Sequence, residues 1–206
     1  MTTIAWADAL EQDAPDIVAA WRGIEAGRFV SVRREVRRRA RPGSADAIVG
    51  QLEATANALT AVLESLPDDA FSMPGGESDW TVAEAVGHDA AARAGLVMAG
   101  ALAASRRWPA DAPTVVPSVP GPAAADRDEL ARKIAQSQRI VARSARQIAG
   151  HEIDPCPLDH PLVGRLRCGE WLLFAGVHDV MHLEQLHRID ERLRNRSATE
   201  AGSSVG

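Results

Sequence analysis

Apolar positions recur at helical spacing through most of the chain, whereas the strict alternation expected of a strand is nearly absent. The clearest stripe lies in the segment 45–66. Its apolar residues return every three or four positions, at Leu52, Ala56, Leu59, Leu63 and Leu66. Similar patterns predict further helices at about 15–40, 81–107, 126–150 and 170–195. The pattern therefore predicts an all-α protein.

The ends of these segments carry recognisable signals. Thr81 and Glu84 have the spacing of a capping box, in which each side chain hydrogen-bonds to the backbone of the other residue. Ser44 follows a Pro-Gly turn and is the expected N-cap of the second segment. Five prolines between positions 109 and 122 exclude a helix from that stretch. We therefore expect an extended connection there.

The four segments after residue 44 are similar in length, and each is too apolar on one side to stand alone. They can bury those sides only against one another, which predicts a four-helix bundle. The proline-rich connection of about 15 residues can span roughly 50 Å, whereas a helix of about 26 residues is only ~39 Å long. The connection can therefore run the length of the bundle as a crossover between the second and third bundle helices.

We accordingly divide the chain into an N-terminal helical extension (1–43), the bundle (44–195) and a small, polar tail (196–206) that is expected to be disordered. The extension carries the apolar residues Ile17, Trp21 and Ile24 at helical spacing. A lone helix of this size would be marginally stable in water. It is therefore expected to pack on the outside of the bundle, or to be exchanged with a neighbouring copy in a homodimer.

Composition narrows the class of protein. The net charge of −5 gives no electrostatic case for nucleic-acid binding. The N-terminus lacks the pattern of a signal peptide, and no apolar run reaches 18 residues, so the protein is expected to be cytoplasmic and to bind no membrane. Two cysteines are too few for a disulfide framework and are expected to be free thiols. A single lysine among 23 basic residues and the high alanine content favour a bacterial source.

The last predicted helix carries two histidines that share one face. His178 and His182 are four residues apart and so lie one turn apart. Trp171, Phe174 and Gln185 fall on the same stripe, which places both imidazoles toward the core. A buried imidazole is costly unless its nitrogens are satisfied, and one shared metal ion can satisfy a nitrogen of each. Hydrogen bonds within the core are an equally simple explanation of this spacing.

His88 is a third candidate, in the helix that starts at the capping box. Its neighbours Ala85, Ala91 and Ala92 are small and leave room beside the ring. A lone histidine there can also be an ordinary core residue with hydrogen-bond partners. Glu84, one turn earlier, is a candidate second-shell carboxylate or base, with simple capping as the alternative.

Two blocks of sequence resemble the DinB/YfiT-like superfamily. The first is the segment 66–88, with LPDDAF and DWTVAEAVGH, and the second is HPLVGRLRCGEWLLFAGVHDVMHLEQL at 160–186. The resemblance implies a four-helix bundle with a long crossover. It also implies that His88, His178 and His182 are metal ligands and that Gln185 is the recurring glutamine of the family. The extension lies outside the usual family core, and Gly87 stands where the family often has a bulky aliphatic residue.

Three neutral histidines leave coordination positions open, which is typical of a catalytic rather than a sealed metal site. Zinc, nickel or iron would accept these ligands. Several members of the resembled family are metal-dependent thiol S-transferases or isomerases that use mycothiol or bacillithiol. The resemblance therefore implies a transferase acting on a small molecule, with mycothiol favoured by the arginine-rich composition. Arg93 and Arg165 are candidates to hold the acidic groups of the thiol.

Two other functions fit the same residues. One is a non-catalytic, metal-binding or stress-associated bundle that works through a partner or as a homodimer, and the other is a metal-dependent hydrolase of a small substrate. The loop residues His151, Cys156 and His160 have no spacing typical of a zinc module. The arginine-rich run 33–41 is expected to be a solvated helix end, with a phosphate or an acidic partner as the alternative.

Overall fold

The computed structural model of the chain describes residues 4–25, 28–76 and 79–203. Within these residues the regular elements are helices and one short hairpin, which confirms the all-α prediction. No helix among them combines the length and the apolar character needed to cross a membrane.

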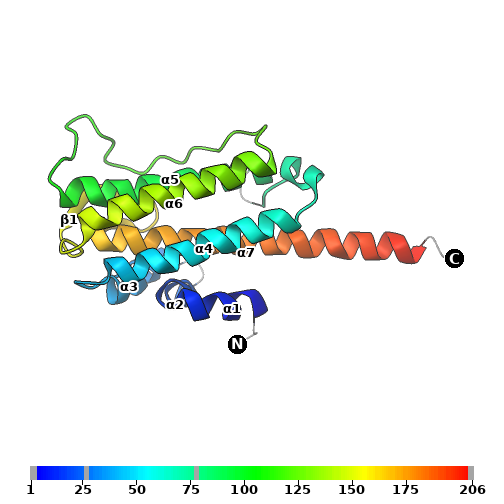
Figure 1. Ribbon diagram of the computed structural model, residues 1–206, viewed down its shortest axis with the longest axis horizontal. Coiled ribbons are helices and arrows are strands. Elements are labelled where there is room, and N and C mark those ends of the chain that lie inside the picture. Colours follow the sequence, from blue (N-terminus) through cyan, green and yellow to red (C-terminus); the bar gives the residue numbers. More distant parts are fainter. Residues whose placement is uncertain (1–3, 26–27, 77–78, 204–206) are drawn as a thin grey trace.

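Four long helices form the bundle (Figure 1). They are α4 (Ala45–Ser65), α5 (Val82–Ala104), α6 (Arg127–Ile148) and α7 (Cys168–Ser203). Helices α4 and α5 each pack against both α6 and α7, so the apolar stripes meet in one core. A 3₁₀ turn, η1 (Asp68–Ser72), and a glycine-containing loop connect α4 to α5.

The connection between α5 and α6 is the long crossover that the prolines indicated. It runs along the bundle, and α5 and α6 are parallel as a result (Figure 1). Near its end the N–H of Gly121 donates to the carbonyl of Glu84 at 2.9 Å. A Cβ added at Gly87 would lie 2.9 Å from the Cα of Gly121, so only glycine fits where the crossover meets α5. This contact explains the glycine at position 87.

The N-terminal extension is three helices rather than the one predicted over 15–40. They are α1 (Ala5–Asp13), α2 (Pro15–Arg22) and α3 (Phe29–Arg39). Pro15 starts α2 because its ring fits the first helical turn but cannot continue α1, and α2 ends at Gly23. The extension packs on α4 and α7 of its own chain.

Ile17 fixes the extension to the bundle. Its side chain is fully buried, and a Cβ added at Gly176 of α7 would lie 2.3 Å from its Cδ1 atom. The backbone N–H groups of Asp16 and Ile17 donate to the side-chain oxygen of Gln51 at 2.8 and 3.1 Å, which caps α2 from α4. Trp21 and Ile24 are partly buried against the same core.

Three arginines of α3 form ion pairs with buried carboxylates of the same chain. Glu35 is buried and accepts hydrogen bonds from Arg39 and Arg34, which lower the pKa of its carboxyl although burial opposes this. Arg37 donates to the buried Glu170 of α7 at 2.7 Å. The Arg37–Glu170 pair attaches α3 to the bundle, whereas the pairs of Glu35 with Arg34 and Arg39 lie within α3 itself.

Two further predictions are corrected by the structure. The loop expected at 151–169 contains an antiparallel hairpin, β1 (Pro155–His160) and β2 (Gly164–Arg167). Backbone hydrogen bonds between Asp159 and the crossover stabilise it. Its strands alternate in burial, with Cys156, Leu158 and Leu166 inside, but each is too short for the pattern to stand out in the sequence. The tail expected to be disordered from 196 continues α7 to Ser203, because no proline or glycine interrupts it before Gly202. Residues 204–206 lie outside the described residues.

We expect Ile17→Ala to destabilise the protein by about 2–5 kcal/mol, because it leaves a cavity against Gly176 that the rigid helices cannot fill. Urea denaturation followed by circular dichroism measures this change. Val30→Ala in the same extension is the control, since Val30 is 68% exposed and its truncation should change stability by less than about 0.5 kcal/mol. Equal effects of the two variants would show that the extension contributes no packing to the bundle.

Candidate metal centre

The three predicted histidines come together between two neighbouring helices. His88 lies on α5, and His178 and His182 lie on α7. One ring nitrogen from each lies within 4.8 Å of the corresponding nitrogens of the other two. His182 is buried at 4% exposure, and the other two are partly buried. They are the one group of three or more such side chains that could hold a metal ion among the described residues.

Each imidazole donates from Nδ1 to an oxygen. His88 Nδ1 lies 2.8 Å from the carbonyl of Val119 in the crossover, and His178 Nδ1 lies 2.8 Å from Oδ1 of Asp89. His182 Nδ1 lies 2.9 Å from Oε1 of Gln185. Carbonyl and carboxylate oxygens can only accept, so the proton of each neutral ring is on Nδ1. The lone pair that a metal would use is then on Nε2 in all three rings.

Gln185 connects one of the three rings to the loop before α5. Its amide nitrogen donates to the carbonyl of Gly75, so its oxygen faces His182. The N–H of Gly75 in turn donates to the carbonyl of Trp80 at 2.7 Å. The loop before α5 therefore orients a ring on α7. Trp80 also covers His88, with ring centroids 4.9 Å apart.

A buried network of charges lies behind the histidines. Asp89, Arg93 and Asp179 are fully buried, and Arg93 donates to Asp179 and, at 3.1 Å, to Thr55. Burial raises the pKa of Asp179, and Arg93 opposes that rise. Burial also acts to raise the pKa of Asp89, but charge on His182 and His178 and on Arg93 outweighs it, so this pKa lies below its ordinary value.

The residues present fit a divalent cation. Asp89 and Asp179 share one buried guanidinium, and the pKa of Asp89 stays below its ordinary value, so a carboxylate charge lies beside the three rings. Oδ2 of Asp89 and Oδ1 of Asp179 are buried without a hydrogen-bond partner among the described residues, and a nearby cation reduces the cost of such burial. Nitrogens about 2.1 Å from a tetrahedral ion lie about 3.4 Å from one another, so the rings need to close by at most about 1.4 Å.

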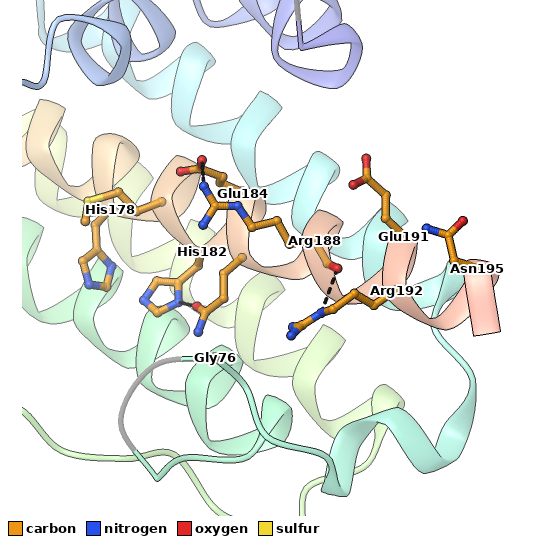
Figure 2. A pocket seen from close by; sticks show the side chains of 10 residues that line it. Gly76, His178, His182, Glu184, Arg188, Glu191, Arg192 and Asn195 are labelled. Carbon is orange, nitrogen blue, oxygen red and sulfur yellow. Dashed lines mark hydrogen bonds and ion pairs between the residues drawn. The ribbon is translucent and has the colours of Figure 1, made fainter. Parts of the chain in front are cut away.

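The metal centre opens into a polar pocket of about 590 Å³ along α7. Figure 2 shows His178 and His182 at one end of this pocket, with Arg188 and Arg192 farther toward the C-terminus. Gly76 forms part of the opposite wall. Arg188 pairs with Glu184, whereas no ion pair of Arg192 is found among the described residues. On its other side the centre borders a more apolar pocket, which His88 and His178 line.

Several candidates from the sequence lie elsewhere. Arg93 is wholly buried, so the prediction that it holds a bound thiol is wrong. Arg165 pairs with Asp159 on the hairpin, and no contact supports the same prediction for it. Glu84 forms the predicted capping box with Thr81, and its carboxylate accepts from the Thr81 N–H at 2.8 Å and from the Thr81 hydroxyl at 3.0 Å. Capping accounts for this side chain.

The loop histidines and both cysteines stay apart from the three rings. His151 pairs with Asp154 at the surface. Cys156 and Cys168 are free and buried, and burial raises the pKa of Cys168 to about 12. Neither thiol is therefore a ready nucleophile at neutral pH. His160 lies at the end of β1 with its ring against Phe174 of α7.

Sequence reasoning missed the residues behind the histidines. Asp89 directly follows His88, and Asp179 directly follows His178. A charged residue in an otherwise apolar, alanine-rich part of a core helix must find a partner inside the protein, and this signal was available in the sequence. No sequence pattern marks the carbonyl of Val119, because any residue offers one.

Comparison with known proteins agrees with the geometry. The family model described as the DinB superfamily matches residues 51–186, which include all three histidines. The match confirms the resemblance inferred from the two sequence blocks. No curated protein and no solved structure matches the chain.

We expect His178→Ala to lose most of the bound metal, because two remaining histidines hold a divalent ion weakly. Metal analysis of the purified protein after dialysis against zinc, nickel or iron gives the stoichiometry. His151→Ala is the matched control, since His151 is exposed and pairs only with Asp154 among the described residues. Retention of one ion per chain in His178→Ala would rule out the three-histidine centre.

Gly87→Val is expected to weaken metal binding by about 10–100-fold without removing any ligand. The added side chain would push Gly121 and the crossover away from α5, and Val119 would no longer orient His88. Competition with a chelator measures the affinity. Gly95→Ala is the control on the same helix, because nothing lies within 4 Å of a Cβ added there. Unchanged affinity in Gly87→Val would show that the crossover does not position His88.

Proposed function

Because this chain belongs to the DinB superfamily, we propose that it is a metal-dependent thiol S-transferase that uses a low-molecular-weight thiol such as mycothiol. His88, His178 and His182 would hold the ion, and zinc, nickel and iron all accept imidazole ligands. One observation carries the proposal: three imidazoles converge with each Nδ1 held by an oxygen, and two of them, His178 and His182, line an open pocket. A sealed structural site would have no such opening.

A divalent metal on three histidines binds a thiol and favours its thiolate form at neutral pH. In the transfer itself the thiol loses its proton to solvent. A sulfur–carbon bond forms while the leaving group departs from the electrophile with the bonding electron pair. The protein keeps the rings rigid throughout through Asp89, Gln185 and the Val119 carbonyl, so the reacting sulfur is held in one position.

The polar pocket suits a hydrophilic thiol with acidic or polar groups. Arg192 lines it, and its Nε donates to the carbonyl of Arg188 at 3.2 Å. Arg192 can hold a carboxylate of the thiol by charge-assisted hydrogen bonds, a role first considered for Arg93 and Arg165. Glu184 and Glu191 line the same pocket and can accept from hydroxyl or amino groups. This mixture of charges favours a polar thiol over a purely apolar one.

The open pocket also favours turnover over the non-catalytic alternative. A bundle that only stores or senses metal needs no cavity of about 590 Å³ next to the ligands. The hydrolase alternative uses the same residues and is separated from transfer by experiment.

The metal-loaded protein is expected to conjugate monochlorobimane with mycothiol or bacillithiol, as followed by fluorescence. His182→Ala should lower the rate by more than about tenfold. Loss of a metal ligand should reduce activity at least as much as loss of a residue that hydrogen-bonds to a ligand. Arg192→Gln should raise the KM for the thiol about tenfold and leave kcat nearly unchanged. His151→Ala should match the parent protein.

Equal rates in His182→Ala and the parent would reject metal-dependent transfer. Stoichiometric metal without turnover of any thiol would support the binding bundle. Thiol-independent release of product from small esters or amides by the metal-loaded protein would support the hydrolase.

A further inference from the structure

A second pocket, with mainly apolar walls, meets the metal centre from the side opposite the arginines. Its volume is about 340 Å³. His88 and His178 form its floor where it reaches the centre. Its apolar walls come from the extension, α5, the crossover and α7, and they include Ile24, Val32, Ala92, Leu96, Val116 and Phe174. Among the residues that the structure describes, none with a carboxylate, lysine or arginine side chain lines it.

Exposed apolar side chains gather at the mouth of this pocket. Leu162 of the hairpin turn is 53% exposed and Met181 of α7 is 40% exposed, and both line it. A neighbouring groove of about 400 Å³ shares Ala92 and Leu96 and continues along the crossover, past the exposed Met98. Large exposed apolar residues that cluster around a concave site are typical of ligand binding.

His160 supplies a hydrogen-bond donor in the same wall. Its Nδ1 accepts from the backbone N–H of Leu162 at 3.2 Å. A neutral imidazole whose Nδ1 accepts carries its proton on Nε2. Burial lowers the pKa of His160 to about 4, and charge on His178 acts in the same direction, so the ring is neutral at pH 7. The wall therefore offers an N–H group next to Phe174, whose ring lies 5.3 Å from that of His160.

We propose that this apolar pocket binds the second substrate, a small, neutral, largely apolar electrophile with one hydrogen-bond acceptor that meets Nε2–H of His160. As an electrophile site the pocket rests on the proposed transfer. His178 lines both pockets, so a polar thiol on one side and an apolar molecule on the other would meet at the metal centre. The mainly apolar walls favour a neutral molecule over a second anion on this side.

The extension determines the width of this pocket. Ile24 and Val32 lie before residue 51, where the family match begins, and both line the wall. The rest of the pocket comes from the bundle and its connections. The range of electrophiles accepted is therefore set in part by a segment outside the matched family region.

Direct binding tests the pocket without any thiol. The probes are 2-acetylnaphthalene, which has one carbonyl acceptor, and 2-ethylnaphthalene, which has none, titrated into the metal-loaded, full-length protein by calorimetry. The acetyl compound should bind about fivefold more tightly, the value expected for one hydrogen bond. His160→Phe keeps the ring packing and should abolish that difference.

A filled pocket is the second arm of the experiment. Ala92→Leu should weaken binding of both probes by more than about tenfold, because the larger side chain occupies the space that they need. Ala131→Leu on α6 is the matched control, since Ala131 lines neither apolar pocket. Metal stoichiometry and thermal unfolding confirm that each variant folds. In the transfer assay, Ala92→Leu should raise the KM for monochlorobimane and leave the KM for the thiol unchanged.

The outcomes separate this inference from the proposed function. Probe binding that Ala92→Leu abolishes supports the apolar pocket even if no thiol is turned over, in which case only the transfer proposal fails. Equal probe binding in Ala92→Leu and Ala131→Leu overturns the pocket, whatever the transfer assay gives. An acetyl preference that survives in His160→Phe overturns the role of His160.

Discussion

The convergence of three imidazoles, one buried and two partly buried, between α5 and α7 is the constraint on which the rest of the structure depends. A buried ring nitrogen without a partner would destabilise the fold, so each Nδ1 needs an oxygen at a fixed place. The three oxygens come from the crossover, from α5 and from α7 itself: the Val119 carbonyl, Asp89 and Gln185. Helices, crossover and the loop at Gly75 must all be in position before the three rings can converge.

This requirement explains features that the bundle alone does not need. The glycines at 87 and 121 allow the crossover to approach α5 closely enough for its carbonyl to reach His88. The Arg93–Asp179 pair places a buried cation beside Asp89, whose carboxylate also accepts from His178. Burial of such a network is costly unless further positive charge lies nearby, and a bound metal would supply it. The polar interior is therefore matched to the centre rather than to packing.

The placement of the centre also governs what can reach it. It lies where a polar pocket along α7 meets an apolar pocket under the crossover. The extension is anchored by Ile17 in the space left by Gly176, and this position brings Ile24 and Val32 to the apolar wall. Elements outside the four helices thus shape the access to a centre that the four helices hold.

The sequence by itself determined the helical class, the crossover and the identity of the three histidines, because periodicity, prolines and the spacing of His178 and His182 are local signals. Pro15 and Gly23 are local signals that divide the extension, and the prediction of one helix there missed them. Local signals did not show that the hairpin at 155–167 also bonds to the distant crossover through Asp159. Only the tertiary structure decided the ring tautomers and the burial of Arg93. Both depend on which oxygens and charges lie nearby in space, and residues far apart in the chain supply them.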